Sequence, residues 1–173
     1  MANTSQASQT REMDGVVLGE SSNFVWIDVG TDHLAVASPS EFGSLRRNER
    51  LRVYLVGSDP EALFLVSRKP PHDRLNLKQA FEQRAVISGV VTSFVKGGFI
   101  VDIGRPAFMP TSRSGGRDRE ERERLVGKQI LCTIEEFEEN IQDIIVDRRN
   151  LLEAADLWGQ RSAGGGLKVG TVV

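Results

Sequence analysis

The sequence predicts an all-β chain made of two tandem barrels of five short strands, joined by a short helical linker. The first observation behind this prediction is an internal repeat, because residues 14–30 align without a gap on residues 88–104. Five positions are identical in the two stretches, namely Gly15, Val16, Val17, Asp28 and Gly30 of the first. The second observation is that both repeats continue with short runs of β-forming residues in the same order. Two copies of one small β fold explain both observations.

The second repeat indicates how many strands each copy contains. We expect strands near residues 86–95, 98–103, 106–109, 128–137 and 142–147. Alternating polarity in LCTIEEF and DIIVD is typical of strands with one face on a core. Because closing five short strands into a barrel removes exposed edges, we expect each repeat to be a five-stranded barrel of the OB type.

The remaining segments connect and flank the barrels. After two prolines end the first repeat, Asp73 or Asn76 can cap a linker helix that runs through Gln83. The apolar face of this helix is formed by Leu77, Ala80 and Phe81. A second helix is expected at NLLEAADLW, followed by a flexible linker, QRSAGGG. The last residues, LKVGTVV, resemble the opening of both repeats, so we expect the front part of a longer multi-repeat protein.

These segments give an expected domain organisation along the whole chain. It comprises a disordered tail (1–13), a first barrel (14–69), the helical linker (70–84), a second barrel (85–149), a helix with a Gly-rich linker (150–167) and the start of a third repeat (168–173).

Composition limits the function classes that fit this chain. The net charge is −2 and each repeat is close to neutral, so any nucleic-acid contact must come from local patches. Cys132 is the only cysteine, which excludes an internal disulfide and a cysteine-clustered zinc site. We expect a cytoplasmic protein without a membrane partner, because no apolar run is long enough for a membrane span or a signal peptide.

Two stretches of the second repeat carry a family resemblance. VISGVVTSFVKGGFIVDIGRPAFMPTS resembles the start of the second repeat in the bacterial ribosomal protein S1 family, a family of S1-type RNA-binding domains. EFEENIQDIIVDRRNLLE resembles the last strand and exit helix of that repeat. The first repeat resembles the more divergent first repeat of the family, and LKVGTVV resembles the entry into a third.

The resemblance implies a string of OB modules on the small ribosomal subunit. In the family, later repeats hold messenger RNA, and the first two repeats anchor the protein to a neighbouring small-subunit protein. We therefore expect a translation protein that anchors a longer chain and contacts single-stranded mRNA or rRNA weakly and without sequence specificity. The alternatives are a pure protein-docking module, or an accessory RNA-binding region of a nuclease or transcription factor.

Strand alternation sorts the aromatic side chains of residues 93–110 into core and surface. Phe99 shares one strand face with Val101, whereas Ile100 shares the other face with Asp102. An unpaired carboxylate is costly to bury, so we expect Asp102 to face outward and Phe99 to lie in the core.

Two other aromatic residues are candidates for stacking on RNA bases. Trp26 occupies the repeat position of Ile100, so it faces outward, either as a stacking platform or packed against a loop or the linker helix. Phe108 is expected to face outward because Met109 has the opposite parity. The resemblance also implies a lost contact at Pro110, where many RNA-binding members of the family carry a histidine.

Four basic side chains are candidates for phosphate contacts, and each has the alternative of being an ordinary surface residue. They are Lys96 at the Gly-Gly turn, Arg105, Arg148 and Arg149. The acidic run at residues 135–139 opposes RNA binding and suits a basic protein partner or bulk water. Residues 112–127 alternate in charge, which predicts a mobile, solvated loop ending in a short helix with paired charges.

No catalytic motif is present in the sequence. His33 and His72 lie in different repeats without a spaced ligand partner, and Cys132 has the apolar neighbours of a core strand residue. We expect no enzymatic activity, no cofactor, no metal and no small-molecule substrate. The expected partners are RNA and a small-subunit protein, and the chain itself is expected to be a monomer.

Overall fold

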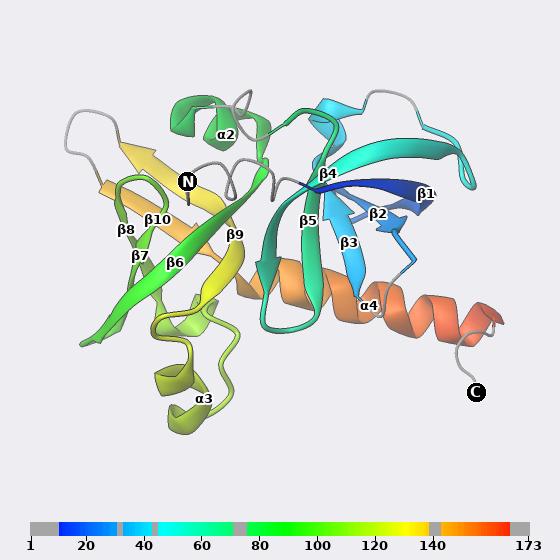
Figure 1. Cartoon of the computed structure of the whole chain (residues 1–173). Helices are drawn as coiled ribbons and strands as arrows, with labels where there is room; N and C mark the ends of the chain where they lie inside the picture. Colours follow the sequence, from blue (N-terminus) through cyan, green and yellow to red (C-terminus); the bar gives the residue numbers. More distant parts are fainter. Residues whose placement is uncertain (1–10, 31–32, 43–44, 71–75, 139–142, 167–173) are drawn as a thin grey trace, which may run out of the picture.

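The computed structural model describes residues 11–30, 33–42, 45–70, 76–138 and 143–166, with side chains as far as residue 159. It confirms the predicted fold class, two closed barrels of five strands each (Figure 1). Barrel 1 consists of β1 (Arg11–Ser21), β2 (Phe24–Asp28), β3 (Leu34–Ala37), β4 (Arg50–Asp59) and β5 (Leu63–Ser67). Barrel 2 consists of β6 (Val86–Val95), β7 (Gly98–Asp102), β8 (Pro106–Pro110), β9 (Gln129–Glu138) and β10 (Asp143–Asp147).

The observed strands of barrel 2 follow the expected ranges closely, although residue 142 lies outside the described part of the chain. Strand β1 already begins at Arg11, inside the segment expected to be a disordered tail. Residues 168–173, the expected start of a third repeat, also lie outside the described residues.

The internal repeat is visible in the geometry of the two barrels. Each barrel carries a bulge in its first strand at the same place relative to the second strand. After the second strand, the backbone N–H of Gly30 donates to Asp28 Oδ1 (2.8 Å), and that of Gly104 donates to Asp102 Oδ1 (2.9 Å). Both glycines have positive φ, 79° and 103°, which glycine adopts without steric cost. The shared Asp-x-Gly motif therefore builds the same turn twice.

The two barrels enclose separate cores. In barrel 2, Phe99, Val101 and Met109 are fully buried, which confirms the inward orientation expected for Phe99. Asp102 is exposed, as its charge requires. In barrel 1, Val25 and Ile27 of β2 point into the corresponding core.

The helix between the barrels, α2 (Leu77–Gln83), begins at a capping box. The backbone N–H of Gln79 donates to Asn76 Oδ1 (2.9 Å), and that of Asn76 donates to Gln79 Oε1 (3.1 Å). Asn76 is therefore the cap, and Asp73, the other candidate, lies outside the described residues. Ala80 is buried against the core of barrel 2 together with the partly buried Leu77 and Phe81, as expected.

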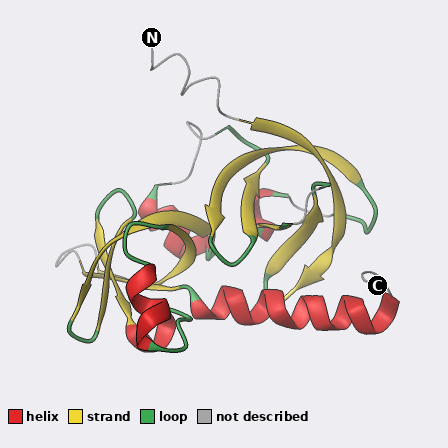
Figure 2. Cartoon of the chain, turned by 60° about the horizontal axis from the view of Figure 1, so that its bottom comes forward, coloured by secondary structure: helices red, strands yellow, loops and turns green. Residues whose placement is uncertain are grey.

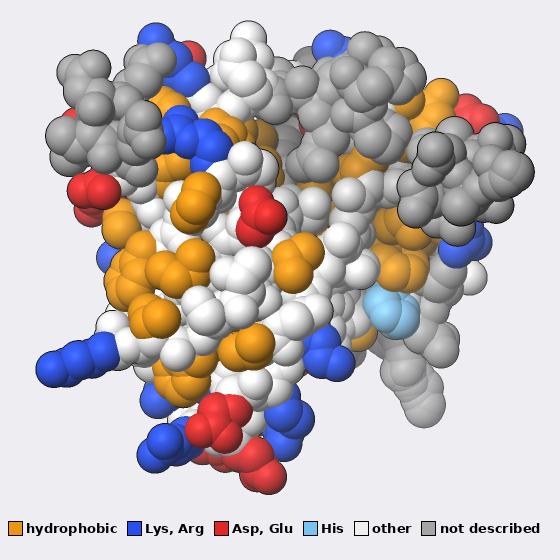
Figure 3. Space-filling view, turned by 60° about the vertical axis from the view of Figure 1, so that its left-hand side comes forward, with side chains coloured by type: hydrophobic (Ala, Val, Ile, Leu, Met, Phe, Trp, Pro, Cys, Tyr) orange, Lys and Arg blue, Asp and Glu red, His pale blue; other side chains and the backbone are white. Residues whose placement is uncertain are grey.

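The short 3-10 helices η1 (Pro39–Glu41) and η3 (Thr111–Arg113) each follow the third strand of a barrel. Helix α3 (Arg119–Arg124) lies in the charged insertion and begins at Asp118, which accepts a hydrogen bond from the backbone N–H of Glu121. Its expected paired charges are present as the i,i+4 pair Arg119–Glu123 and its neighbour Glu120–Arg124. At the lower end of Figure 3, acidic and basic side chains lie side by side over this helix.

The last helix, α4 (Arg149–Gly166), is longer than the sequence suggests. We expected QRSAGGG to be a flexible linker, but the helix continues through these residues. Extending an existing helix adds one hydrogen bond per residue without a new nucleation cost. Figures 1 and 2 show that α4 starts beside barrel 2 and runs along barrel 1.

The two barrels are held together by a buried ion pair. Arg148, which follows β10, donates to both carboxylate oxygens of Asp59 at the end of β4 (2.8 and 2.7 Å). The backbone N–H of Leu131 in β9 donates to the same carboxylate (2.9 Å). Both charged side chains are buried, and two parallel hydrogen bonds join the guanidinium to the carboxylate. This contact therefore fixes one barrel against the other.

Candidate nucleic-acid interface

OB-type barrels bind oligonucleotides across their second and third strands. In barrel 2 these strands and the adjacent β10 place Ile100, Phe108 and Ile145 in one row, because Phe108 is paired in register with both isoleucines. All three side chains alternate with core residues, face outward and are partly exposed. We call these residues the open row. Figure 3 turns this side of the molecule forward and shows hydrophobic side chains gathered on the surface of barrel 2.

Polar groups border the open row on two sides. Ser93 of β6 pairs with Ile100, and Glu136 of β9 pairs with Ile145. Glu136 is exposed, so one border of the row carries negative charge. The expectation that part of the acidic run faces outward is confirmed for Glu136, while residue 139 lies outside the described chain.

Phe108 lies directly over the backbone of β7. A Cβ atom at Gly98 would clash with the Met109 carbonyl oxygen and would come within 2.6 Å of Phe108 Cζ. Glycine at this position therefore permits the close approach of β8 and of the one aromatic ring of the open row. The outward orientation predicted for Phe108 is confirmed, and Met109 is fully buried.

Two of the four basic candidates flank the open row. Lys96 is exposed in the turn before β7, where Gly97 takes a φ of 86°. Arg105 is half-buried in the turn after β7, where its carbonyl accepts a hydrogen bond from the backbone N–H of Ile103 (3.0 Å). Since β7 runs between these turns, the two cations lie at the two ends of this strand, on either side of Ile100.

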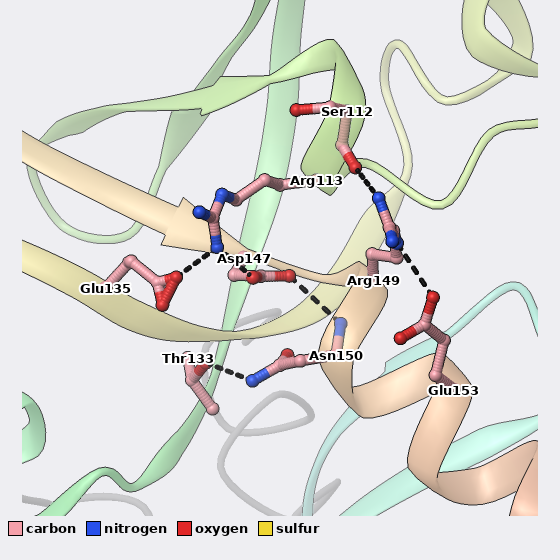
Figure 4. Close-up of polar contacts among 8 residues, drawn as sticks. All are labelled: Ser112, Arg113, Thr133, Glu135, Asp147, Arg149, Asn150 and Glu153. Atoms are coloured by element: carbon pink, nitrogen blue, oxygen red, sulfur yellow. Dashed lines mark hydrogen bonds and ion pairs between the residues drawn. The ribbon is translucent and has the colours of Figure 1, made fainter.

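The other two basic candidates form hydrogen bonds with other residues of the chain. Arg148 was a candidate for a phosphate contact, with an ordinary surface position as the alternative, and both interpretations are wrong, because its side chain is 3% exposed and bound to Asp59. Arg149 is exposed, but its guanidinium donates to Glu153 Oε2 (2.8 Å) and to the carbonyl of Ser112 (2.9 Å; Figure 4). The hydrogen bond to Glu153 and its charge raise the pKa of Arg149.

Figure 4 also shows a polar network that the sequence pattern did not reveal. Arg113 in η3 bridges Glu135 of β9 and Asp147 of β10. Asp147 in turn accepts a hydrogen bond from the backbone N–H of Asn150 in α4 (3.0 Å). The hydrogen bond to Asp147, followed by the charge of Glu135, raises the pKa of Arg113. This network ties two strands to α4 and uses one arginine of the charged insertion for structure.

Trp26 is not available for stacking in this structure, although its repeat position favoured an outward platform. Its side chain does leave the barrel 1 core, but it is 0% exposed. The indole packs against Phe24 and against Trp158 of α4, and its Nε1 donates to Ser21 Oγ (3.0 Å). The alternative interpretation, packing against a helix, describes it correctly, but the helix is α4 and not the linker helix.

The described residues offer no grouping suited to a bound metal, since no three His, Cys, Asp or Glu side chains among them gather at one place. Cys132 is fully buried in β9, and burial raises the pKa of its thiol to about 12. Among the described helices, none has the length and hydropathy needed to cross a membrane.

Comparison with known proteins finds similarity to ribosomal proteins. No protein-family model matches it. Small ribosomal subunit protein bS1 of Chlamydia muridarum is 31% identical over 159 residues, covering 87% of this chain and 28% of bS1. The bS1 of Mycobacterium leprae is 28% identical over 155 residues, covering 82% and 32%. The chain thus spans less than a third of the length of these relatives.

The solved structure of a multidomain protein with nucleic acid binding domains from Streptococcus pneumoniae TIGR4 also matches. The match covers 86% of this chain and 59% of that protein's chain, at 15% sequence identity. Its TM-score of 0.29 is too low to bear on the fold. The sequence matches extend over both barrels, and the barrels have the predicted five-stranded form. The chain is therefore similar to bacterial ribosomal protein bS1 over most of its own length, and its two five-stranded barrels are consistent with S1-type domains.

Proposed function

We propose that this chain is an RNA-binding module of a cytoplasmic ribosomal S1-like protein and that its RNA site is the open row of barrel 2. The observation that carries the proposal is the exposed row Ile100, Phe108 and Ile145 on the strands with which OB barrels bind oligonucleotides. Phe108 supplies the ring on which a base stacks, and Lys96 and Arg105, in the turns before and after β7, are placed for phosphate contacts.

The composition of the open row supports weak binding without sequence preference. It contains one aromatic ring, and stacking of one base contributes about 1–3 kcal/mol. Glu136 at its border repels a phosphate backbone, and the chain has a net charge of −2. Isoleucine side chains cannot read hydrogen-bonding edges of bases, so the row accepts any base.

The acidic surface beside the open row favours a second candidate function, docking on a basic protein of the small subunit. Glu136, Glu138 and Asp143 are exposed on the paired strands β9 and β10. Such a surface complements a basic partner and supports anchoring of a longer protein on the ribosome. The relatives carry the name of a small ribosomal subunit protein, which agrees with this proposal.

RNA binding is tested by titrating the chain into a fluorescent oligouridine and following the anisotropy. F108A should weaken binding about 5- to 150-fold, as loss of one stacked base predicts. V126A is the matched control, because Val126 is an exposed apolar residue of barrel 2 outside the row. Equal affinity of F108A and V126A would remove Phe108 from the site.

Docking is tested by co-sedimentation of the chain with small ribosomal subunits. The double variant E138K/D143K should reduce co-sedimentation, while F108A should leave it unchanged. Failure of the wild-type chain to co-sediment, or unchanged co-sedimentation of the double variant, would reject docking through this acidic surface.

A further inference from the structure

Barrel 1 carries the counterpart of the open row. Its second, third and fifth strands place Trp26, Val36 and Leu65 in one line, because Val36 is paired in register with both neighbours. This is the same arrangement of strands that places Ile100, Phe108 and Ile145 together in barrel 2. The counterpart residues are, however, only 0%, 0% and 3% exposed. This face is therefore exposed in barrel 2 and covered in barrel 1.

Helix α4 of the same chain forms part of the cover, together with Val86 and Leu131 of barrel 2. Leu151 and Ala154 of α4 are buried in one cluster with the covered row, and Trp158 packs against that cluster. The rings of Trp158 and Trp26 are stacked, with centroids 6.1 Å apart and planes inclined by 20°. Figures 1 and 2 both show α4 lying along barrel 1.

The backbone of barrel 1 leaves space for the ring of Trp158. Gly19 of β1 is paired with Trp26, and a Cβ atom at Gly19 would come within 2.7 Å of Trp158 Cη2. The ungapped repeat places Ser93 at this position in barrel 2. Barrel 1 thus has a space bordered by Gly19 and by the ring of Trp26, and this space accommodates a flat ring.

A flat ring stacked on an outward aromatic side chain is also how a single-stranded nucleic acid binds an OB barrel. The indole N–H of Trp26 donates a hydrogen bond to Ser21, and the face of its ring is the part that α4 covers. We propose that the row Trp26–Val36–Leu65 is a second site for single-stranded RNA and that α4 occupies it in this structure, with Trp158 in the place of a base. This inference rests on the proposed function of the equivalent row in barrel 2.

The chain contains two tryptophans, so W158A leaves Trp26 as its only indole. In W158A we expect acrylamide to quench Trp26 and a short oligouridine of about 12 nucleotides to quench it as well. The number of oligouridine sites per chain should rise from one to two. L157A is the matched control, because Leu157 is the neighbouring residue of α4 and is 58% exposed. This control should keep one site.

A second pair of variants displaces α4 without removing either tryptophan. A154E places a carboxylate in the buried contact with barrel 1, whereas L157E places one on the exposed side of the same helix. A154E should gain the second site and L157E should not. Circular dichroism and retained binding at barrel 2 show that the variants are folded.

The outcomes separate this inference from the proposed function. If W158A and A154E still bind one oligouridine per chain, and Trp26 of W158A is unquenched, the second site is refuted while the barrel 2 site stands. If the wild type does not bind but W158A does, the covered site is supported and the barrel 2 site is refuted. If no variant binds oligouridine, both proposals fail.

Discussion

Replacing Asp59 with asparagine should strongly destabilise the protein, because it leaves a buried arginine without its counter-charge. The Asp59 carboxylate accepts hydrogen bonds from two nitrogens of Arg148 and from the backbone N–H groups of Leu131 and Glu61. The side chains of Asp59 and Arg148 are 0% and 3% exposed. The asparagine side chain has nearly the same shape, so the substitution changes charge and hydrogen bonding while preserving the packing.

The expected cost follows from this burial. Removing one partner of a buried ion pair typically destabilises a protein by about 3–5 kcal/mol. R52Q is the matched control, because Arg52 pairs with Glu12 and Asp14 on the surface and its side chain is 60% exposed. An exposed pair contributes about 0–1 kcal/mol, so R52Q should leave stability almost unchanged.

Urea unfolding followed by circular dichroism measures both variants. The double variant D59L/R148M, which replaces the pair with apolar side chains, should be more stable than D59N, because it leaves no buried charge unpaired. If D59N costs no more than R52Q, Asp59 and Arg148 do not form a buried bond between the barrels.

Three further predictions concern the barrel 2 core. F99A should reduce the free energy of unfolding by about 3–5 kcal/mol in urea titrations, because Phe99 is fully buried; a loss below about 1 kcal/mol would place the ring outside the core. Cys132 should resist iodoacetamide at pH 8 and react after unfolding, and rapid labelling of the folded chain would contradict its burial. Burial raises the folded pKa of the thiol from 9.0 to about 12, so the unfolded state loses this proton first. The stability of the wild type should therefore fall, relative to that of C132A, as pH rises from 9 towards 12.

Local patterns predicted much of the fold. Alternation placed Phe99 inside and Phe108 outside, because a strand turns successive side chains to opposite faces regardless of its neighbours. The capping residue could be narrowed to Asp73 or Asn76 from its own segment, because a cap accepts hydrogen bonds from the first turn of its own helix. Because the two repeats align, the strand order predicted for barrel 2 could also be predicted for barrel 1.

The contacts between distant segments could not be predicted in this way. Alternation correctly turned Trp26 outward from its barrel, but it carries no information about α4, which covers that face. Arg148 looked like a surface cation because its partner, Asp59, lies 89 residues away in the other barrel. Arg113 likewise has no signal in its own segment, since its partners come from β9 and β10.

The central claim, that single-stranded RNA binds the open row of barrel 2, is tested most directly by NMR of the isotope-labelled chain during titration with oligouridine. The amide signals of Ser93, Ile100, Phe108 and Ile145 and the methyl signals of the two isoleucines should shift together, along with the amide signals of the Lys96 turn. Signals of Val36 and Leu65 in barrel 1 should stay in place, because α4 covers them. Shifts centred on barrel 1 or on α3, with the open row unchanged, would contradict the claim.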